Sequence, residues 1–312
     1  MERRKSLKLQ KVEVILRRLR KSHASFPMIE QDHAKMLAGY KGERSIDYFL
    51  SYIDEDYYIF NNIRLADRNY SFQIDTLIIS PFFICILEVK NIAGTLFFDD
   101  VFDQMIRTID GKDEGFSSPV IQVRRQREHL QNWLIEQKLQ PIPIEGLIVI
   151  SNPSTIIKSS KSDYPQVIHS ANIPLKIKGL QAKYNKKIFP KQSLKKLAGL
   201  IVDLNTEDDT DVLSLYKIER KEIVTGVQCQ NCGQFNSVRI QGLWRCSNCT
   251  HKSKDAHIQS LEDYKLIFGE KITNQKLRSF LHMSSRTSAT KLLRSLKYRQ
   301  QGKTKDRFYI IK

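Results

Sequence analysis

Residues 72–90 read Phe-Gln-Ile-Asp-Thr-Leu-Ile-Ile-Ser-Pro-Phe-Phe-Ile-Cys-Ile-Leu-Glu-Val-Lys. Two runs of apolar, β-branched and aromatic residues flank the Ser-Pro-Phe segment at 80–82, which predicts two strands joined by a tight turn. If the last two residues of this segment form the turn, counting outward along both strands places Asp75 opposite Glu88. The stretch therefore predicts a hairpin that brings two carboxylates together.

Lys90 adds a positive charge to this predicted pair. Opposed side chains of an antiparallel pair lie roughly 4.5–5.5 Å apart at Cβ, and two like charges there are destabilising. A divalent cation between Asp75 and Glu88 would remove that repulsion. Because Lys90 lies two residues after Glu88, the period of a strand puts both on one face. The alternative is a surface strand end with an ordinary Glu–Lys ion pair.

Four short motifs of this region resemble the nuclease-related domain (NERD) family. They are Gly42-Glu43, Gln73-Ile74-Asp75, Glu88-Val89-Lys90 and Pro119-Val-Ile-Gln122. The resemblance covers roughly residues 35–155, and the family belongs to the restriction-endonuclease-like superfamily with its PD-(D/E)XK signature. It implies an α/β core, a mixed sheet flanked by helices, that carries a Mg²⁺-dependent (or Mn²⁺-dependent) phosphodiesterase site. Ile74 departs from the pattern, since it stands where the signature has proline.

The resemblance also implies the roles of the residues in this site. Asp75 and Glu88 would hold the metal, and Lys90 would polarise the phosphate or the attacking water. Glu43 and Gln122 would complete the site, with Gln122 orienting a water or a substrate phosphate.

Two of these residues can also be interpreted without the family. A helix predicted over 39–53 gives Glu43 the same face as its apolar residues, and burying a carboxylate there is costly without a partner. The alternative is an acid at a helix N-terminus, which the helix dipole favours. A second helix, predicted to start with a capping serine at Ser118-Pro119, carries Gln122, Gln126 and His129 on one polar face. The alternative is a solvated face.

Composition indicates a polyanionic partner. Lysine and arginine number 51 against 34 acidic residues, a net charge of +17, which favours binding to nucleic acid or to an acidic membrane surface. Residues 1–21 hold nine basic residues against two acids, and residues 271–312 hold twelve against Asp306 alone. Residues 7–21 predict a basic amphipathic helix that packs on the core, contacts phosphates or touches anionic lipid, with packing favoured.

The location expected from the sequence is the cytoplasm. No apolar run approaches the ~18 residues of a membrane span, and the N-terminus lacks the apolar stretch of a signal peptide. Five cysteines, four of them regularly spaced, do not suit a secreted disulfide framework.

Those four cysteines predict a zinc ribbon. Cys229-x-x-Cys232 and Cys246-x-x-Cys249 are separated by the thirteen residues 233–245, slightly fewer than is usual for this pattern. Four thiolates in two short turns are what a closed, tetrahedral Zn²⁺ site needs, and such a site serves folding rather than catalysis. Cys85 is left over inside an apolar strand and is interpreted as a core residue.

The C-terminal 60 residues predict a mostly helical, winged-helix-like domain with a helix-turn-helix. Three short helices are followed by a basic hairpin with Gly302 at its turn, and the third helix would enter a major groove. The alternative is a three-helix module that binds another protein. The residues predicted to face nucleic acid are Arg286, Thr287, Ser288, Thr290, Lys291, Arg294, Lys303 and Lys305.

The sequence thus predicts five segments and one leading function. The segments are a basic helical segment (1–34), the nuclease-like domain (35–155, closed by a strand at 146–150), a peripheral extension (156–225), the zinc ribbon (226–252) and the helix-turn-helix domain (253–312). The leading function is a metal-dependent nuclease, with DNA as the expected substrate. The alternatives are a non-catalytic regulator that binds nucleic acid through its C-terminal part, and a factor that processes RNA.

Overall fold

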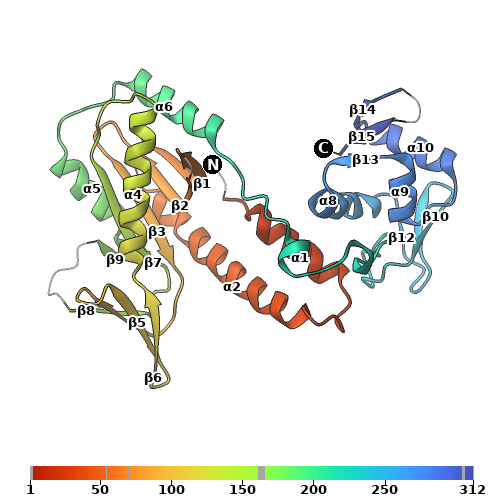
Figure 1. Ribbon diagram of the computed structural model, residues 1–312, viewed down its shortest axis with the longest axis horizontal. Coiled ribbons are helices and arrows are strands. Elements are labelled where there is room, and N and C mark those ends of the chain that lie inside the picture. The colour runs from red at the N-terminus through yellow and green to blue at the C-terminus, as the bar shows by residue number, and fades with distance from the viewer. Residues whose placement is uncertain (1–2, 54, 69, 161–165, 304–305, 312) are drawn as a thin grey trace. The chain divides into compact units, whose positions relative to one another are not determined.

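The chain folds into two compact units. The structure is a computed structural model that describes residues 3–53, 55–68, 70–160, 166–303 and 306–311 (Figure 1). Contacts divide the chain into unit 1, residues 1–6 and 35–208, and unit 2, residues 7–34 and 209–312. No helix in the described part of the chain has both the length and the apolar composition needed to cross a membrane.

Unit 1 is built on a mixed five-stranded sheet. Its strands, in spatial order, are β1 (Tyr58–Asp67), β2 (Tyr70–Ile79), β3 (Ile84–Lys90), β7 (Ile144–Ile150) and β9 (Val167–His169). The first three pair antiparallel, whereas β7 pairs parallel with both β3 and β9. The strand predicted at 146–150 therefore does not close the sheet. β9 has only three residues, too few for an alternating pattern that could be recognised from the sequence.

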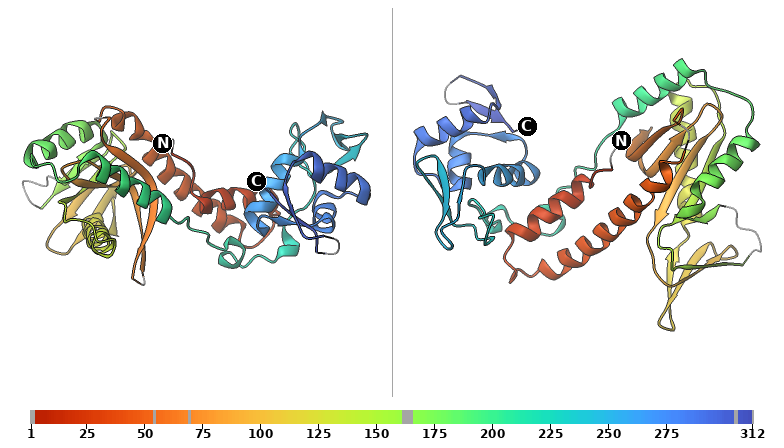
Figure 2. Two further views of the ribbon diagram at one scale, coloured as in Figure 1. Left: turned by 90° about the horizontal axis from the view of Figure 1, so that it is seen from above. Right: turned by 180° about the vertical axis from the view of Figure 1, so that it is seen from behind.

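Helices cover both faces of this sheet. The helices of unit 1 are the C-terminal part of α2 (Phe26–Ser45), α3 (Asp47–Leu50), α4 (Pro119–Glu136), the 3₁₀ turn η1 (Ser170–Asn172), α5 (Ile173–Lys183) and α6 (Lys191–Leu204). On β3, Ile84 and Ile86 pack with α4 and α6, whereas Cys85 and Leu87 pack with α3 and α5. Figure 1 shows α4 across the first face, and Figure 2 (right) shows the α5 side. The predicted restriction-endonuclease-like α/β core is confirmed.

The helix predicted over 39–53 is wrong at both ends. α2 begins at Phe26 and ends at Ser45, and α3 follows as a separate turn. Pro27 lies in the first turn of α2, where a helix needs no N–H donor, so proline does not interrupt it there.

A smaller sheet packs against the beginning of α4. Its spatial order is β6 (Lys112–Ser117), β5 (Gln104–Ile109), β4 (Thr95–Asp99) and β8 (Ile156–Ser159). Phe98 and Met105 of this sheet join Val120 of α4 and Ile150 of β7 in one apolar cluster. The cluster fixes the start of α4, from which Gln122 and Gln126 project.

Unit 2 contains the cysteine-rich segment and the C-terminal helices. Its helices are α1 (Leu7–Arg18), the N-terminal part of α2, α7 (Val212–Leu215), the 3₁₀ turn η2 (Arg220–Glu222), α8 (His257–Phe268), α9 (Asn274–Leu281) and α10 (Arg286–Ser295). One sheet has β10 (Ser237–Ile240), β11 (Leu243–Cys246) and β12 (Lys252–Ser253); the other has β13 (Lys271–Ile272), β15 (Phe308–Ile310) and β14 (Arg299–Gln301). The three helices and the terminal hairpin expected from the sequence are present. Trp244 of β11 shares a core with Leu261, Leu277 and Leu292 of these helices.

The N-terminal basic helix packs on the core, as favoured from the sequence. Arg18 is fully buried and donates from Nε to Oδ2 of the buried Asp263 at 2.7 Å. Its guanidinium lies 4.6 Å from the ring centre of Phe235 and 4.8 Å from that of Phe280. Burial lowers the pKa of Arg18, and the charge of Asp263 opposes that shift. Arg18 therefore joins α1 to the core of unit 2, and its buried guanidinium is not available to a phosphate backbone.

Candidate active site and metal centre

The predicted hairpin register is the observed one. The ladder between β2 and β3 ends with Thr76 opposite Leu87, so the next pair in the same register is Asp75 opposite Glu88. Asp75 Oδ2 accepts a hydrogen bond of 3.0 Å from the N–H of Val89, which follows Glu88. The two carboxylates thus meet at the end of the antiparallel ladder.

Both oxygens of the Glu88 carboxylate have partners from the same face of the sheet. Lys90 Nζ donates to Glu88 Oε1 at 2.7 Å and to Gln122 Oε1 at 3.0 Å. Gln126 Nε2 donates to Glu88 Oε2 at 2.8 Å and to the carbonyl of Gln73 at 3.0 Å. The Glu–Lys pair of the alternative interpretation is present, but Glu88 is only 2 % exposed. It is therefore not part of an ordinary surface strand end.

Glu43 is held from the N-terminus of the chain. Arg3, whose side chain is fully buried, pairs from Nη1 with Glu43 Oε2 at 3.2 Å and from Nη2 with Asp47 Oδ1 at 3.1 Å. Arg3 Nη1 also donates to the carbonyl of Asp75 at 3.0 Å. Glu43 lies in the last turn of α2, where the helix dipole disfavours a negative charge. The dipole explanation considered from the sequence is therefore wrong, and the charge of Arg3 compensates Glu43 instead.

Two carboxylates of this cluster, Asp75 and Glu43, resist ionisation. Burial, followed by the negative charges of Glu88 and Glu43, raises the pKa of Asp75 to about 8. The Val89 N–H and the charge of Lys90 act in the opposite direction. Burial also raises the pKa of Glu43, and the charge of Arg3 and a hydrogen bond with Asn62 partly offset that shift. A cation near Asp75 would relieve this crowding of negative charge.

The donor set fits Mg²⁺ or Mn²⁺. Mg²⁺ prefers oxygen ligands and is commonly held by one or two carboxylates, with water and substrate phosphate completing its shell. Asp75 and Glu88 supply two such carboxylates. Among the described residues no set of three acidic side chains has all its ligand atoms within 4.8 Å of one another. The arrangement therefore suits a cation shared with water and substrate rather than one enclosed by protein.

A cavity of about 600 Å³ adjoins the two glutamines of α4. Its described lining residues are Phe72, Gln73, Asp103, Ser117, Ser118, Ile121, Gln122, Arg125, Gln126 and His129. The His129 imidazole stacks on Phe72 with ring centres 5.4 Å apart, and its Nδ1 lies 3.0 Å from Asp67 Oδ2. His129 thus forms the wall of the cavity and does not reach the carboxylates as a bonded partner.

Residues 38–151 match the family model described as the nuclease-related domain. This part of the chain is a nuclease-related domain. The match includes Glu43, Asp75, Glu88, Lys90 and Gln122, which the fold brings together around the paired strands β2 and β3. No curated protein and no solved structure matches the chain.

Three residues that contact the cluster were not predicted for it. Gln126 bonds directly to Glu88, and its position four residues after Gln122 on one helical face was the available signal. Asn62, which bonds Glu43, has a φ of +52° within β1, a conformation that asparagine tolerates better than most residues. Arg3 lies 40 residues before Glu43, outside the nuclease-related domain, and no pattern of the sequence connects the two.

Arg3 is expected to act as a positioning residue. Arg3→Ala should lower the cleavage proposed below by about 10- to 100-fold, the usual effect of removing a group that orients a metal-site residue. Because Arg3 lowers the pKa of Glu43, its loss raises that pKa further, and the acidic limb of the pH–rate profile should move to higher pH. Arg3→Lys should restore the profile in part, since it keeps the charge.

The exposed neighbour Arg4 supplies the matched control. Arg4→Ala should leave both the rate and the profile unchanged, in protein tagged at the C-terminus so that the N-terminal segment stays native. A rate loss in Arg3→Ala without any movement of the pH profile would mean that Arg3 only stabilises the fold.

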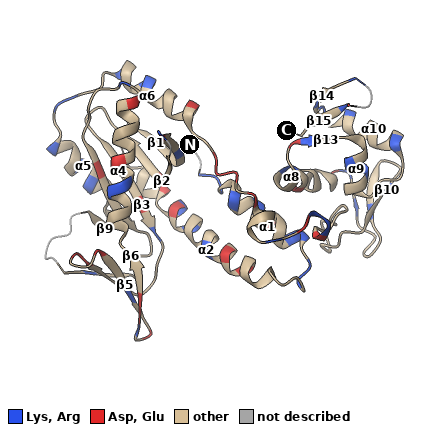
Figure 3. Ribbon diagram, viewed as in Figure 1, with Lys and Arg blue, Asp and Glu red and all other residues tan. Residues whose placement is uncertain are grey.

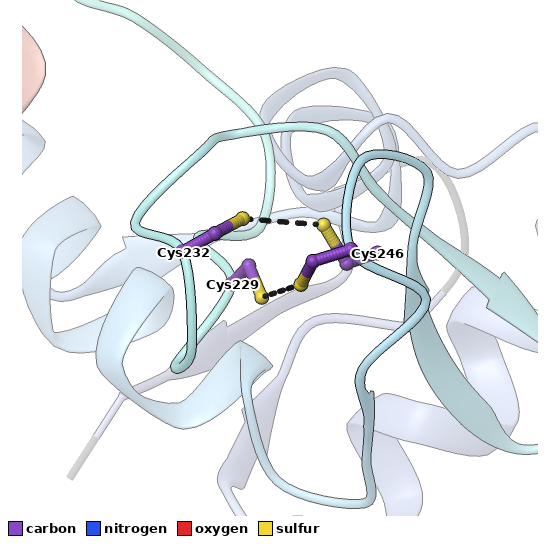
Figure 4. A group of neighbouring side chains, drawn as sticks. Cys229, Cys232 and Cys246 are labelled. Atoms are coloured by element: carbon purple, nitrogen blue, oxygen red, sulfur yellow. Dashed lines mark hydrogen bonds between the residues drawn. The ribbon is translucent and has the colours of Figure 1, made fainter.

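The four cysteines predicted for zinc come together in unit 2. Their sulfurs all lie within 4.8 Å of one another, with Cys229–Cys249 at 3.6 Å and Cys232–Cys246 at 3.5 Å. Figure 4 shows the sulfurs of Cys229, Cys232 and Cys246 turned toward one another. A tetrahedron with Zn–S bonds of about 2.3 Å has edges of about 3.8 Å, whereas a disulfide needs about 2.05 Å. The cluster fits a zinc site.

Hydrogen bonds from N–H groups favour the thiolates of Cys232 and Cys249 in this cluster. The N–H groups of Asn231 and Asn248 each donate to a cysteine sulfur at 3.4 Å. Hydrogen bonds from Asn231 and from the His251 backbone lower the pKa of Cys249 to about 6, whereas burial raises that of Cys229 to about 11. The remaining cysteine, Cys85, is a buried core residue as predicted, and burial raises its pKa.

The residues predicted to face nucleic acid are spread over α10 and the hairpin. Six of them lie on α10: Arg286, Thr287, Ser288, Thr290, Lys291 and Arg294. Lys303 lies in the turn between β14 and β15, and Lys305 lies outside the described residues. All six residues on α10 are exposed except Thr290, whose hydroxyl bonds internally to the carbonyl of Arg286 at 3.0 Å. Figure 3 marks the Lys and Arg residues of α9 and α10 in blue.

Proposed function

We propose that this protein is a metal-dependent nuclease that hydrolyses phosphodiester bonds, with DNA as its substrate. The observation that carries the proposal is the buried Asp75–Glu88 pair with Lys90 on the same strand, inside a nuclease-related domain. Two neighbouring carboxylates repel each other when both are ionised, and a fold that keeps them together loses stability. The presence of this pair beside a bonded lysine supports a cation-binding, catalytic role.

Asp75 and Glu88 would hold Mg²⁺ or Mn²⁺. When bound, such an ion supplies a hydroxide-like water at neutral pH and neutralises charge on the phosphate. The protein's own part is positional. Gln126 and Lys90 together fix both oxygens of Glu88, while the Val89 N–H fixes one oxygen of Asp75.

Lys90 and Gln122 would contact the substrate. An ammonium has three donors, and the bonds to Glu88 and Gln122 use two of them. The third donor can stabilise negative charge on a phosphate oxygen, where a preformed positive charge is most effective. Gln122 is exposed beside the 600 Å³ cavity, and its amide N–H₂ can orient a water or a phosphate oxygen.

The other metal and the C-terminal helices would support binding. We propose that Cys229, Cys232, Cys246 and Cys249 bind one structural Zn²⁺. A zinc site made of four reduced cysteines supports a cytoplasmic location, which we also propose. α10 and the terminal hairpin would contact nucleic acid through their basic side chains. A non-catalytic regulator is the second candidate, and the intact set of two carboxylates and a lysine argues against it.

The deciding experiment is a cleavage assay on labelled nucleic acids. Single- and double-stranded DNA and RNA, linear and circular, are incubated with the full chain and Mg²⁺, Mn²⁺ or EDTA. We expect cleavage of DNA that needs Mg²⁺ or Mn²⁺ and that Lys90→Ala lowers by about 10²- to 10³-fold, because one charge-stabilising group is lost. Binding without cleavage under every condition would favour the regulator, and cleavage of RNA alone would favour RNA processing.

A further inference from the structure

Three arginines of the C-terminal helices and hairpin line a single polar cavity of about 400 Å³. Arg278 belongs to α9, Arg286 is the first residue of α10, and Arg307 directly precedes β15. The other described lining residues are Thr273, Asn274, Gln275, Thr290 and Tyr309. None of the described residues that line the cavity is acidic, and its volume is that of a site for a small ligand or a ligand group.

Asn274 fixes two of these arginines relative to each other. Its Nδ2 donates to Thr290 Oγ1 at 3.0 Å and to the carbonyl of Arg286 at 3.1 Å. Its Oδ1 accepts a bond of 3.1 Å from Arg278 Nε. The beginning of α9 is thereby tied to the beginning of α10. Hydrogen bonds between its own lining residues therefore hold the cavity in shape.

The charges of this cavity are not compensated by the part of the chain that the structure describes. None of the three guanidiniums forms a salt bridge with a described residue. Arg307 Nη2 donates to the carbonyl of Lys303 at 2.7 Å, but its buried Nε has no hydrogen-bond partner among the described residues. Three like charges around one cavity repel one another, and an anion would convert that repulsion into attraction.

We propose that this cavity binds a phosphate group, with Arg278, Arg286 and Arg307 as its cationic ligands. The planar fork of a guanidinium matches a phosphate in geometry and charge and binds it through paired hydrogen bonds. The phosphate is either an internal phosphate of a nucleic-acid strand or a terminal phosphate monoester. The site does not depend on cleavage by the nuclease-related domain.

The proposal changes the role expected for the start of α10. From the sequence, Arg286 and Thr290 were predicted to face a major groove and read bases. In the proposed site, Arg286 binds a phosphate, and Thr290 belongs to the hydrogen-bonded group around Asn274. Phosphate contacts fix position and orientation on a duplex but carry no sequence information, so Arg286 should contribute equally to binding of all sequences.

The test measures binding by the full, zinc-loaded chain without added Mg²⁺ or Mn²⁺. Inorganic phosphate is titrated calorimetrically at constant ionic strength, and two duplexes of unrelated sequence are titrated by fluorescence anisotropy across salt concentrations. Arg286→Gln and Arg278→Gln should abolish phosphate binding, weaken both duplexes by about tenfold alike, and lower the log–log salt slope by about 1. Arg286 is exposed, so its variant tests the site without disturbing the hydrogen-bonded group around Asn274.

Arg299→Gln is the matched control, because Arg299 is an exposed arginine of β14 that does not line the cavity. It should keep phosphate binding and nearly all of the duplex affinity. Preference for 5′-phosphorylated over hydroxyl-ended duplexes, lost in Arg286→Gln, assigns a terminal phosphate, whereas equal binding of both assigns an internal one. The proposal is overturned if Arg278→Gln and Arg286→Gln bind phosphate and both duplexes as Arg299→Gln does. If the wild-type chain binds phosphate and both duplexes as expected but cleaves no nucleic acid, that result counts against the nuclease proposal only.

Discussion

Asp75→Asn and Glu88→Gln are each expected to lower Mg²⁺-dependent cleavage by about 1,000-fold or more. A bound divalent cation stabilises charge in the transition state and lowers the activation free energy of a phosphoryl reaction by several kcal/mol. Each 1.36 kcal/mol is a factor of about ten in rate. Each variant removes one of the two proposed carboxylate ligands. Asparagine keeps an oxygen that can accept the bond from the Val89 N–H, so the loss of rate is not a loss of local structure.

The same Asp75 variant should be more stable than the wild type when no divalent cation is present. The pKa of Asp75 is raised from its ordinary value near 3.8 to about 8. A raised pKa means that the folded chain binds a proton that the unfolded chain has lost between these two values. Stability from this group is therefore full below about pH 4 and is lost as the pH rises through about 8. At pH 8 we expect Asp75→Asn to gain about 1–3 kcal/mol of unfolding free energy, with a smaller gain at pH 5.

Thermal unfolding with and without Mg²⁺ provides a readout that is separate from activity. Mg²⁺ should raise the unfolding temperature of the wild type through mass action and leave that of Asp75→Asn nearly unchanged. Glu128→Gln, an exposed residue of α4, makes the same carboxylate-to-amide change and should affect neither cleavage nor stability. Full cleavage by either site variant would remove these carboxylates from the mechanism.

Local patterns in the sequence were sufficient to predict part of this site. Strand pairing across a two-residue turn follows from counting, so the opposition of Asp75 and Glu88 could be predicted and is observed. The start of α4 was equally local, because Ser118 caps the helix by accepting a bond from the Val120 N–H. Cysteine spacing likewise predicted the four-sulfur cluster.

The remainder of the site depends on contacts that no local pattern encodes. Arg3 reaches Glu43 and Asp75 across 40 and 72 residues, and it was predicted as part of a separate basic segment. Helical periodicity gave Gln126 a face but could not show that this face meets Glu88 rather than solvent. The predicted boundary at residue 155 falls between β7 and β9 of one sheet, because parallel strands are joined by long connections that hide their pairing.

Loss of zinc is expected to disrupt the core of unit 2 and not only the ribbon. Trp244 of β11 is buried with Leu261 and Leu277, and its Nε1 donates to His257 Nδ1 at 3.0 Å. Burial lowers the pKa of His257 to about 4, so the ring is neutral and can accept this bond. Structural zinc contributes about 10–16 kcal/mol to the folding of small zinc domains. Cys246→Ser should therefore lose its zinc and release Trp244 from the core.

Fluorescence can follow Trp244 alone, because the chain has only one other tryptophan, Trp133. In a Trp133→Phe background all tryptophan emission comes from Trp244. It should shift to longer wavelength in Cys246→Ser or on chelation of the wild type, while metal analysis falls from one zinc per chain to none. Cys85→Ala removes the fifth cysteine, which lies in the core of unit 1, and should keep one zinc and an unshifted emission. An unshifted emission after complete loss of zinc would show that the helices hold Trp244 unaided and that zinc orders only the two cysteine turns.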